Sequence, residues 1–446
     1  MGETLHEFWR RFARCFRTNT RDTSHYALAY LSAQLRLQTE RNFTNIGRVS
    51  DMPMQNIQHF ISNSSWDAAT PIWQVQKEIV YNPYLQQGGA LLLDESADQK
   101  ASAKTAGAGR QYNGRLGKVE MSQVGTFLSF VHLEQNLWTW VDGELFLPES
   151  WFAKDKADER KRLGIPEDRK FATKIELGWQ MIQRVKENGL PFEIVACDSF
   201  YGRKAWFRAQ MDKTGLLYMC EVPSSNYVWL TSPEQQSARK QTVEEIAKDP
   251  ATVWQTLTVR PTERGMLTQE FAALRVYTDR DEAAGSPWVV EWLVIRKHSD
   301  GKFSYALSNA PADTPIARLA YWKCVRYFVE RSIQDAKSEA GWADLRAQKY
   351  RAWEHHLALT VLATWFIAQT KLNWRHQYPP DPALTAQLEV DRLPTLSMAN
   401  VCTLLRSVLP LPQLTPEEAI HQVTRHLFNR TKSRKSRMKN DAKFQT

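Results

Sequence analysis

Two apolar runs, each leading directly into an aspartate, limit this chain to a small number of folds. Ala90 to Leu93 is unbroken apolar sequence followed by Asp94, and residues 192–197, apolar except for Glu193, form a second strand-like run followed by Asp198. Continuous apolar character is typical of a central strand that is covered on both faces of its sheet. The runs therefore predict two buried strands, each with a carboxylate at its end.

A helix is predicted between these strands. Thr173 and Glu176 form a T-x-x-E capping box, and Gly189 and Pro191 end the segment. Apolar residues recur along it at helical spacing, namely Ile175, Trp179, Ile182 and Val185. Strand, helix and strand in this order predict a βαβ layer with acids at the strand ends.

A third candidate acid lies in residues 321–341, which are predicted to form one helix. Arg326, Glu330 and Lys337 stand at i, i+4 and i+11, so at about 100° per residue they share one face. Each acid also has an ordinary interpretation, because a strand-end aspartate commonly caps a turn and an i,i+4 pair commonly forms a solvated ion pair. Only their combination indicates a site, and three other acids compete for the same roles: Asp98, Asp142 and Glu339.

The spacing of apolar residues predicts helices and strands in the rest of the chain. Residues 1–80 are predicted to be helical, with Leu5, Phe8, Trp9, Phe12 and Phe16 at helical spacing. Further strands are predicted at 124–132 and 137–141, with Asp142-Gly143 as a turn and the Gly-rich segment 101–118 as a loop. Residues 216–310 are strand-rich with a helical patch at 243–248, and 353–369 should be a buried helix, so His355 and His356 are assigned to packing or phosphate contacts.

Composition favours a cytosolic protein with a polyanionic partner. The chain has 446 residues, which predicts two to four domains, and its start lacks the apolar core of a signal peptide. No apolar run of membrane-spanning length occurs, and the five scattered cysteines without a CxxC disfavour a disulfide framework or a zinc cluster. The formal net charge is +9.

The positive charge is uneven. Basic residues crowd the N-terminus, at Arg10, Arg11, Arg14, Arg17 and Arg21, and the C-terminal stretch, at Arg425, Arg430, Lys432, Arg434, Lys435, Arg437, Lys439 and Lys443. Candidate DNA contacts are Arg10, Arg11, Arg110, Arg115, Lys118, Arg326 and Lys337. Solvated tails are the alternative for either end of the chain.

Several ordered blocks resemble a bacterial insertion-sequence transposase of the cut-and-paste DDE type, with a β-strand insertion before the catalytic glutamate. They are ALLLDES, GRQYNGRLGKVEMSQVG, DGELFLPESW, FATKIELGWQMI, VACDSFYG and RYFVERSIQDAKSEAG, within roughly residues 55–370. The resemblance implies an α/β protein with an RNase H-like catalytic core. We expect a helical, DNA-binding region at 1–80, core at 81–215 and 311–375, a β-rich insertion at 216–310, and a helical C-terminal region with a basic tail at 376–446.

The same resemblance implies the chemistry. Asp94, Asp198 and Glu330 fall on the family's catalytic and metal-binding acids, and its R-x3-E-x6-K signature falls on Arg326, Glu330 and Lys337. Two Mg²⁺ ions, with Mn²⁺ as a substitute, would support cleavage and strand transfer on double-stranded DNA, at transposon ends and target, by a cytoplasmic, nucleoid-associated homodimer. The chain departs from the family at Lys323, where the signature has Tyr, and at Glu95-Ser96-Ala97, where members often have Asp-Thr-Gly after the first aspartate.

Two alternatives remain open on the sequence. One is a transposase-derived repressor that binds DNA without catalysis. The other is an RNase H-like nuclease that cuts nucleic acid without strand transfer. Cleavage of element ends with Mg²⁺ but not with EDTA separates the first from an enzyme, and joined products separate the second from a transposase.

Overall fold

The computed structural model describes residues 2–100, 102–114, 116–262, 265–279, 287–378, 382–387 and 396–408, together with positions 417, 420, 424, 427 and 431. The predicted basic C-terminal residues and Arg115 lie outside the described residues. Within these ranges, no helix combines the length and the apolar character that a membrane crossing demands.

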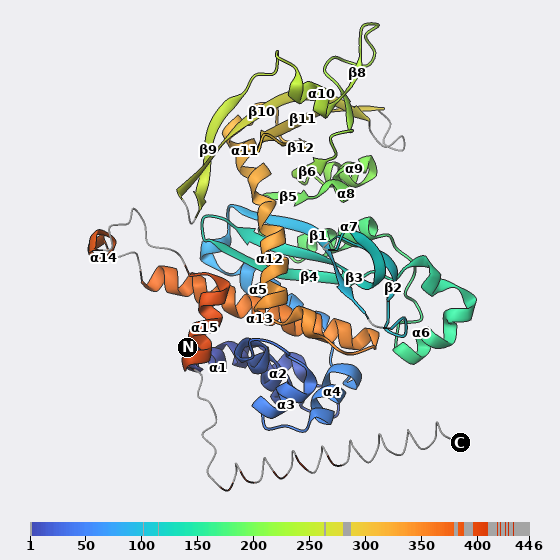
Figure 1. Cartoon of the computed structure of the whole chain (residues 1–446), viewed down its shortest axis with the longest axis vertical. Helices are drawn as coiled ribbons and strands as arrows, with labels where there is room; N and C mark the ends of the chain where they lie inside the picture. The colour runs from blue at the N-terminus through green and yellow to red at the C-terminus, as the bar shows by residue number, and fades with distance from the viewer. Residues whose placement is uncertain are drawn as a thin grey trace.

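A 12-stranded mixed sheet forms the centre of the molecule (Figure 1). Five of its strands follow the order β4 (Leu137–Leu145), β3 (Lys118–His132), β1 (Gly89–Gln99), β5 (Ile194–Cys197) and β6 (Tyr218–Val222). β1 runs antiparallel to β3, which runs antiparallel to β4, whereas β1, β5 and β6 are parallel to one another. β2 (Gly109–Asn113) pairs with the start of β3. The predicted strands at both aspartates and the mixed α/β class are confirmed.

The sheet continues beyond β6 through antiparallel strands. They are β12 (Phe303–Ser308), β11 (Trp288–Lys297), β10 (Gly265–Asp279), β9 (Gln255–Thr262), β7 (Tyr227–Trp229) and β8 (Lys240–Thr242), accompanied by α10 (Val243–Lys248). Residues 216–310 are thus strand-rich, as expected, and they have a small apolar core of their own. They are joined to the main sheet by β12–β6 pairing, and the domain boundaries stay a prediction.

Helices cover both faces of the central strands. α7 (Lys174–Glu187) begins with the predicted capping box at Thr173 and Glu176, and Gly178 lets it lie directly against Leu93 of β1. The buried helix α13 (Tyr350–Gln377) crosses below the sheet, where it contacts α2, α4 and α5 (Figure 1). His355 and His356 are buried in it, which confirms the packing interpretation.

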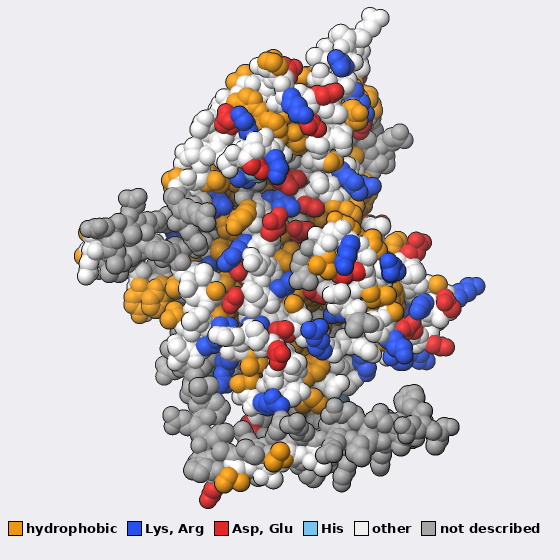
Figure 2. All heavy atoms as spheres, in the orientation of Figure 1, with side chains coloured by type: hydrophobic (Ala, Val, Ile, Leu, Met, Phe, Trp, Pro, Cys, Tyr) orange, Lys and Arg blue, Asp and Glu red, His pale blue; other side chains and the backbone are white. Residues whose placement is uncertain are grey.

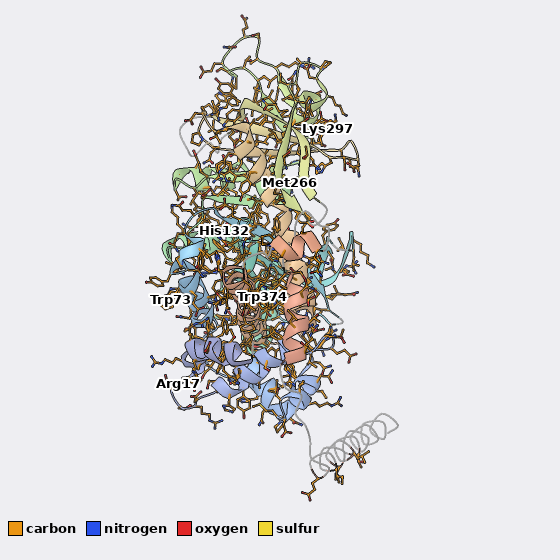
Figure 3. All side chains as sticks on the ribbon, turned by 90° about the vertical axis from the view of Figure 1, so that its left-hand side faces the viewer. Arg17, Trp73, His132, Met266, Lys297 and Trp374 are labelled. Carbon is orange, nitrogen blue, oxygen red and sulfur yellow. The ribbon has the colours of Figure 1, made fainter. Side chains whose placement is uncertain are left out.

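The remaining helices are mostly short. The N-terminal region contains α1 (Gly2–Phe12), α2 (Ser24–Arg36), α3 (Phe43–Val49), α4 (Met54–Asn63) and α5 (Ala69–Val80), and its predicted apolar stripe is buried. Elsewhere lie α6 (Ala157–Leu163), α8 (Ser199–Gly202), α9 (Ala205–Lys213), α11 (Ile316–Val325), α12 (Tyr327–Ser338), α14 (Pro382–Gln387) and α15 (Met398–Val408). Figure 3 shows Met266 and Lys297 in the strand-rich part and Arg17 at the opposite, helical end.

Four local predictions are wrong. Asp142-Gly143 is not a turn but part of β4, where the ladder shifts register at Leu128/Ser129 and Arg184 pairs with the buried Asp142. β1 does not end at Asp94 but continues to Gln99, because β3 pairs with it throughout. Segment 101–118 is not only a loop, since β2 lies within it. The helix expected at 321–341 is two helices, α11 and α12, which meet at Arg326.

Candidate active site

Three acids stand at the same level on three neighbouring parallel strands. Leu93 of β1 lies opposite Cys197 of β5, and Cys197 lies opposite Cys220 of β6. The next residue on each strand is therefore Asp94, Asp198 and Glu221 respectively. Because the three strands are parallel, this register brings the two predicted aspartates together and adds Glu221 beside them.

Glu221 was not among the predicted site residues. It follows the apolar run Tyr218–Cys220 in the same way that Asp94 and Asp198 follow theirs, so an acid after a strand-like run was an available signal. The parallel pairing of β5 with β6, which gives that signal its meaning, is a long-range property that the sequence does not display.

Asp94 and Asp198 are largely withdrawn from water. Burial raises the pKa of Asp94 to about 8, the charge of Asp198 adds to the rise, and Arg326 opposes it. Burial also raises the pKa of Asp198 to about 6, with Glu95 adding to the rise. One oxygen of Asp94 accepts the Glu95 backbone N–H at 2.8 Å. Two crowded carboxylates with raised pKa values form a site that a positive charge would stabilise.

Asp198 also caps a short helix. Its Oδ1 accepts the backbone N–H groups of Phe200 and Tyr201 at 3.0 and 3.4 Å, so it begins α8. Gly202 then ends α8 against β6, where a Cβ would lie 2.0 Å from the Glu221 carbonyl oxygen. The Asp198–Gly202 motif thus fixes the second aspartate by a cap at one end and a close backbone contact at the other.

Arg326 sits between the acids at the junction of α11 and α12. Its Nη1 donates to Oε1 of Glu330 at 2.7 Å, and its Nε lies 3.0 Å from Oε2 of Glu221. The Arg326 side chain is 17% exposed, whereas that of Glu330 is 63% exposed. Glu330 therefore lies at the rim of the site in contact with Arg326. Figure 2 shows acidic and basic side chains side by side across the middle of this face.

Lys323 is the second cation bound to Glu221. Its Nζ lies 2.7 Å from Oε1 of Glu221, and its side chain is 1% exposed. Burial lowers the pKa of Lys323, and Glu221 opposes that change. Although burial acts to raise the pKa of Glu221, Lys323 and Arg326 together hold it below its ordinary value.

Residues 11–279 match the model of the DDE superfamily endonuclease family. The chain belongs to the DDE superfamily of endonucleases. It is also 25% identical over 299 residues, covering 66% of this chain and 69% of the relative, to a probable transposase for insertion sequence element IS701 from Microchaete diplosiphon. These findings confirm the family resemblance. The matched range of this DDE superfamily endonuclease contains Asp94, Asp198 and Glu221 and ends before Glu330.

Lys337 does not lie beside Arg326 and Glu330, the other two residues of the R-x3-E-x6-K signature. Its Nζ lies 2.9 Å from Oδ1 of Asp98 and 3.2 Å from the Ala97 carbonyl oxygen, on the extension of β1. The eleven residues from Arg326 to Lys337 correspond to about 16 Å of helix rise. Lys337 therefore fastens α12 to β1, at a distance from the aspartate pair.

The competing acids have partners of their own. Asp98 binds Lys337, Asp142 binds Arg184 at 2.8 Å, and Glu339 lies 3.9 Å from Arg406. Among the predicted DNA contacts, Arg10, Arg110 and Lys118 are exposed, the latter two on the β2–β3 hairpin. Arg11 is bound to Glu78 and to Gln369 at 2.6 and 2.7 Å.

The donor set of the aspartate pair suits a hard divalent cation. Mg²⁺ prefers carboxylate oxygens and keeps several waters, so one or two carboxylates are enough to hold it. Over the described part of the chain, no group of three or more His, Cys, Asp or Glu residues is arranged to hold a metal ion. Asp94 and Asp198 fit the implied cation, whereas Glu330 would have to leave Arg326 to join them.

Proposed function

We propose that this DDE superfamily endonuclease is a transposase that cleaves transposon ends and joins them to target DNA. The observation that carries the proposal is the register of β1 and β5, which sets Asp94 beside Asp198. The strand order β4-β3-β1-β5-β6 supports an RNase H-like core. In it, β4, β3 and β1 are antiparallel to their neighbours, whereas β1, β5 and β6 are parallel to one another. The β-rich insertion before Glu330 would then lie within the predicted residues 216–310, at strands β7–β11.

Asp94 and Asp198, joined by Glu330, would hold two Mg²⁺ ions, or Mn²⁺ as a substitute. When bound, the ions would activate the attacking oxygen and stabilise the leaving oxygen of the phosphodiester. Arg326 would bind the phosphate, because a guanidinium offers bidentate donors to phosphate oxygens. Phosphate would compete with Glu330 for Arg326, so DNA binding would free the Glu330 carboxylate. Lys337 stays proposed as a phosphate contact, which requires release from Asp98.

The substrate would be double-stranded DNA, at transposon ends and target, bound by a homodimer that cuts two ends together. Arg10, Arg110 and Lys118 are exposed cations and support a DNA contact at both the helical end and the β2–β3 hairpin. A duplex carries a dense row of phosphates, so such contacts would make affinity depend strongly on salt. A DNA-binding protein of this kind would be found in the cytoplasm, with the nucleoid.

One observation favours a second candidate, a DNA-binding relative without catalysis. Glu330 is 63% exposed, is paired with Arg326, and lies beyond the matched range 11–279. A chain that had lost cleavage would keep its DNA contacts while this acid served only as an ion-pair partner. The enzyme is preferred, because burial of Asp94 and Asp198, and the charge of Asp198 beside Asp94, cost stability that a pure DNA binder has no need to lose.

The test is cleavage of a labelled duplex carrying the terminal sequence of the DNA segment that encodes the chain. We expect nicked and joined products with Mg²⁺ or Mn²⁺, none with EDTA, and none from Asp198→Asn, which should still shift the duplex in a gel. Asp313→Asn, at an exposed acid, is the matched control. Binding without cutting would identify the repressor, cut products without joined ones the nuclease, and normal cleavage by Asp198→Asn would refute the site.

A further inference from the structure

We propose that Glu221 is a positioning residue that holds Arg326 for contact with a DNA phosphate. This inference rests on the proposed function, since it assigns a task within the same site. Glu221 occupies the third place in the row that begins with Asp94 and Asp198, yet it faces two cations of its own chain. Glu221 is therefore ion-paired with Lys323 and Arg326 and does not join the aspartate pair.

The two oxygens of Glu221 are divided between two cations. Oε1 lies 2.7 Å from Nζ of Lys323, and Oε2 lies 3.0 Å from Nε of Arg326. The contact between Nε and Glu221 is an ion pair without the alignment of a hydrogen bond, and Nη1 is the atom that donates to Glu330. A phosphate that displaced Glu330 would meet Nη1 while the ion pair with Glu221 stayed in place.

Charges alternate from the interior to the surface along this chain of contacts. The side-chain exposure is 1% for Lys323, 24% for Glu221, 17% for Arg326 and 63% for Glu330. Buried Lys323 needs a counter-charge, and Glu221 supplies it. One carboxylate then serves two cations, so departure of Glu330 leaves Nη1 of Arg326 without its carboxylate partner at the rim. Arg296 adds a further positive charge that acts on Glu221. The freed guanidinium donor is complementary to a phosphate oxygen.

The backbone that carries Glu221 is fixed on every side. β6 lies between β5 and β12, and Glu221 is itself paired with Ala306 of β12. Gly202 of the second aspartate's motif packs against the Glu221 carbonyl oxygen. The anchor for Arg326 is thus built into the same rigid layer as the aspartates, and a side chain mounted on a central strand positions a partner more precisely than one on a loop.

Lys323 explains why a glutamate is needed at this place. Its side chain is 1% exposed, so its ammonium group needs a counter-charge. With Lys in that position, Glu221 both neutralises the buried ammonium and fixes Arg326. The contact between Lys323 and Glu221 thus extends to Arg326, the arginine proposed to bind phosphate.

A double-mutant cycle in DNA affinity tests the coupling without any need for cleavage. The full chain, R326Q, E221Q and E221Q/R326Q are titrated in EDTA with a fluorescent duplex carrying the terminal sequence of the encoding DNA. We expect R326Q to weaken binding about 10-fold in the natural background and less than about 3-fold in the E221Q background. Equal factors in both backgrounds, or no effect of R326Q in either, would overturn the proposal.

Cleavage under single-turnover conditions supplies the second readout. E221Q should lower the rate at saturating duplex about 10-fold or more, and E221D should restore part of that loss. E221Q/K323M removes both buried charges, so it should recover the thermal stability lost in E221Q without recovering the rate. Recovery of rate together with stability would reduce Glu221 to a structural role. E270Q, which removes an ion pair on β10, is the matched control.

These measurements separate the inference from the function on which it rests. Coupling between Glu221 and Arg326 in EDTA, together with no cleavage by the natural chain under any divalent cation, would sustain the positioning role and overturn the transposase. Cleavage by the natural chain without coupling would do the reverse.

Discussion

The guanidinium of Arg326 holds the carboxylate of Glu330 at 2.7 Å, so the helix-borne acid of the proposed site is paired with a cation of its own chain. The strand-borne acids differ, because Asp94 and Asp198 are close enough for the charge of one to raise the pKa of the other. The aspartate pair is therefore ready to receive a cation, whereas Glu330 depends on what else binds Arg326.

This difference predicts how Mn²⁺ binds in the absence of DNA. Asp94→Asn and Asp198→Asn should each weaken Mn²⁺ binding by more than about 10-fold, because each removes a carboxylate ligand. Glu330→Gln should change the affinity less than about 2-fold, since an acid engaged by Arg326 contributes little. Calorimetric titration measures all three. A large loss in Glu330→Gln without DNA would show that Arg326 does not restrain this acid.

Gly202→Ala should damage the site through the backbone. A Cβ there would lie 2.0 Å from the Glu221 carbonyl oxygen, so α8 and β6 must move apart. We expect a loss of about 1–3 kcal/mol in the free energy of unfolding, together with slower cleavage, because Asp198 begins α8. Denaturant melts measure the loss.

Gly114→Ala is the control for this prediction. The added methyl group at Gly114 would have no atom within 4 Å, so stability should stay unchanged or rise slightly. A Gly202→Ala variant as stable as Gly114→Ala would contradict the close packing of α8 on β6.

Local signals in the sequence predicted much of this fold. The capping box at Thr173 and Glu176 set the start of α7, and the apolar runs before Asp94 and Asp198 identified β1 and β5. Each is a short-range pattern with a direct physical cause. The aspartates lie together because β1 and β5 are parallel with Leu93 opposite Cys197, although β1 itself continues to Gln99.

The errors arose where long-range contacts override local preference. Asp142-Gly143 has turn chemistry, but pairing with β3 keeps it in β4, and Arg184 from α7 compensates its buried charge. Glu221 could not be assigned to the site from the sequence, because only the pairing of β6 with β5 places it beside Asp198. The break of the 321–341 helix at Arg326 has no counterpart in the sequence, which contains neither Gly nor Pro from 316 to 340.

Asp142 provides a test of stability without catalysis. Its carboxylate is bound by Arg184 at 2.8 Å, and it also accepts the Gly143 backbone N–H. Asp142→Ala should lower the free energy of unfolding by about 1–3 kcal/mol, less than a fully buried pair would cost, because Arg184 is 43% exposed. Cleavage per folded molecule should stay normal. Loss of cleavage without loss of stability would return Asp142 to the list of candidate site acids.

His356 makes stability depend on pH in the acid range. It is buried beside Trp342, its Nε2 lies 3.1 Å from the Trp342 carbonyl oxygen, and its Nδ1 lies 3.0 Å from the Tyr30 hydroxyl. One donor and one acceptor satisfy the neutral ring. Burial lowers the pKa of His356 to about 4, with Lys100 acting in the same direction and the Trp342 carbonyl, Asp344 and Asp98 opposing it.

The sign follows from proton linkage. Between pH 6.5 and 4 the unfolded chain binds a proton at this histidine that the folded chain does not, so stability present above pH 6.5 is lost as the pH falls. The contribution of His356 to the loss between pH 7 and pH 5 is about 2 kcal/mol. His356→Gln should therefore lose about 2 kcal/mol less over that interval than the natural chain, whatever its stability at pH 7. Urea melts at the two pH values measure this difference, and His25→Gln, at an exposed histidine, is the matched control. An equal pH dependence in His356→Gln and the natural chain would mean that His356 is charged in the folded protein.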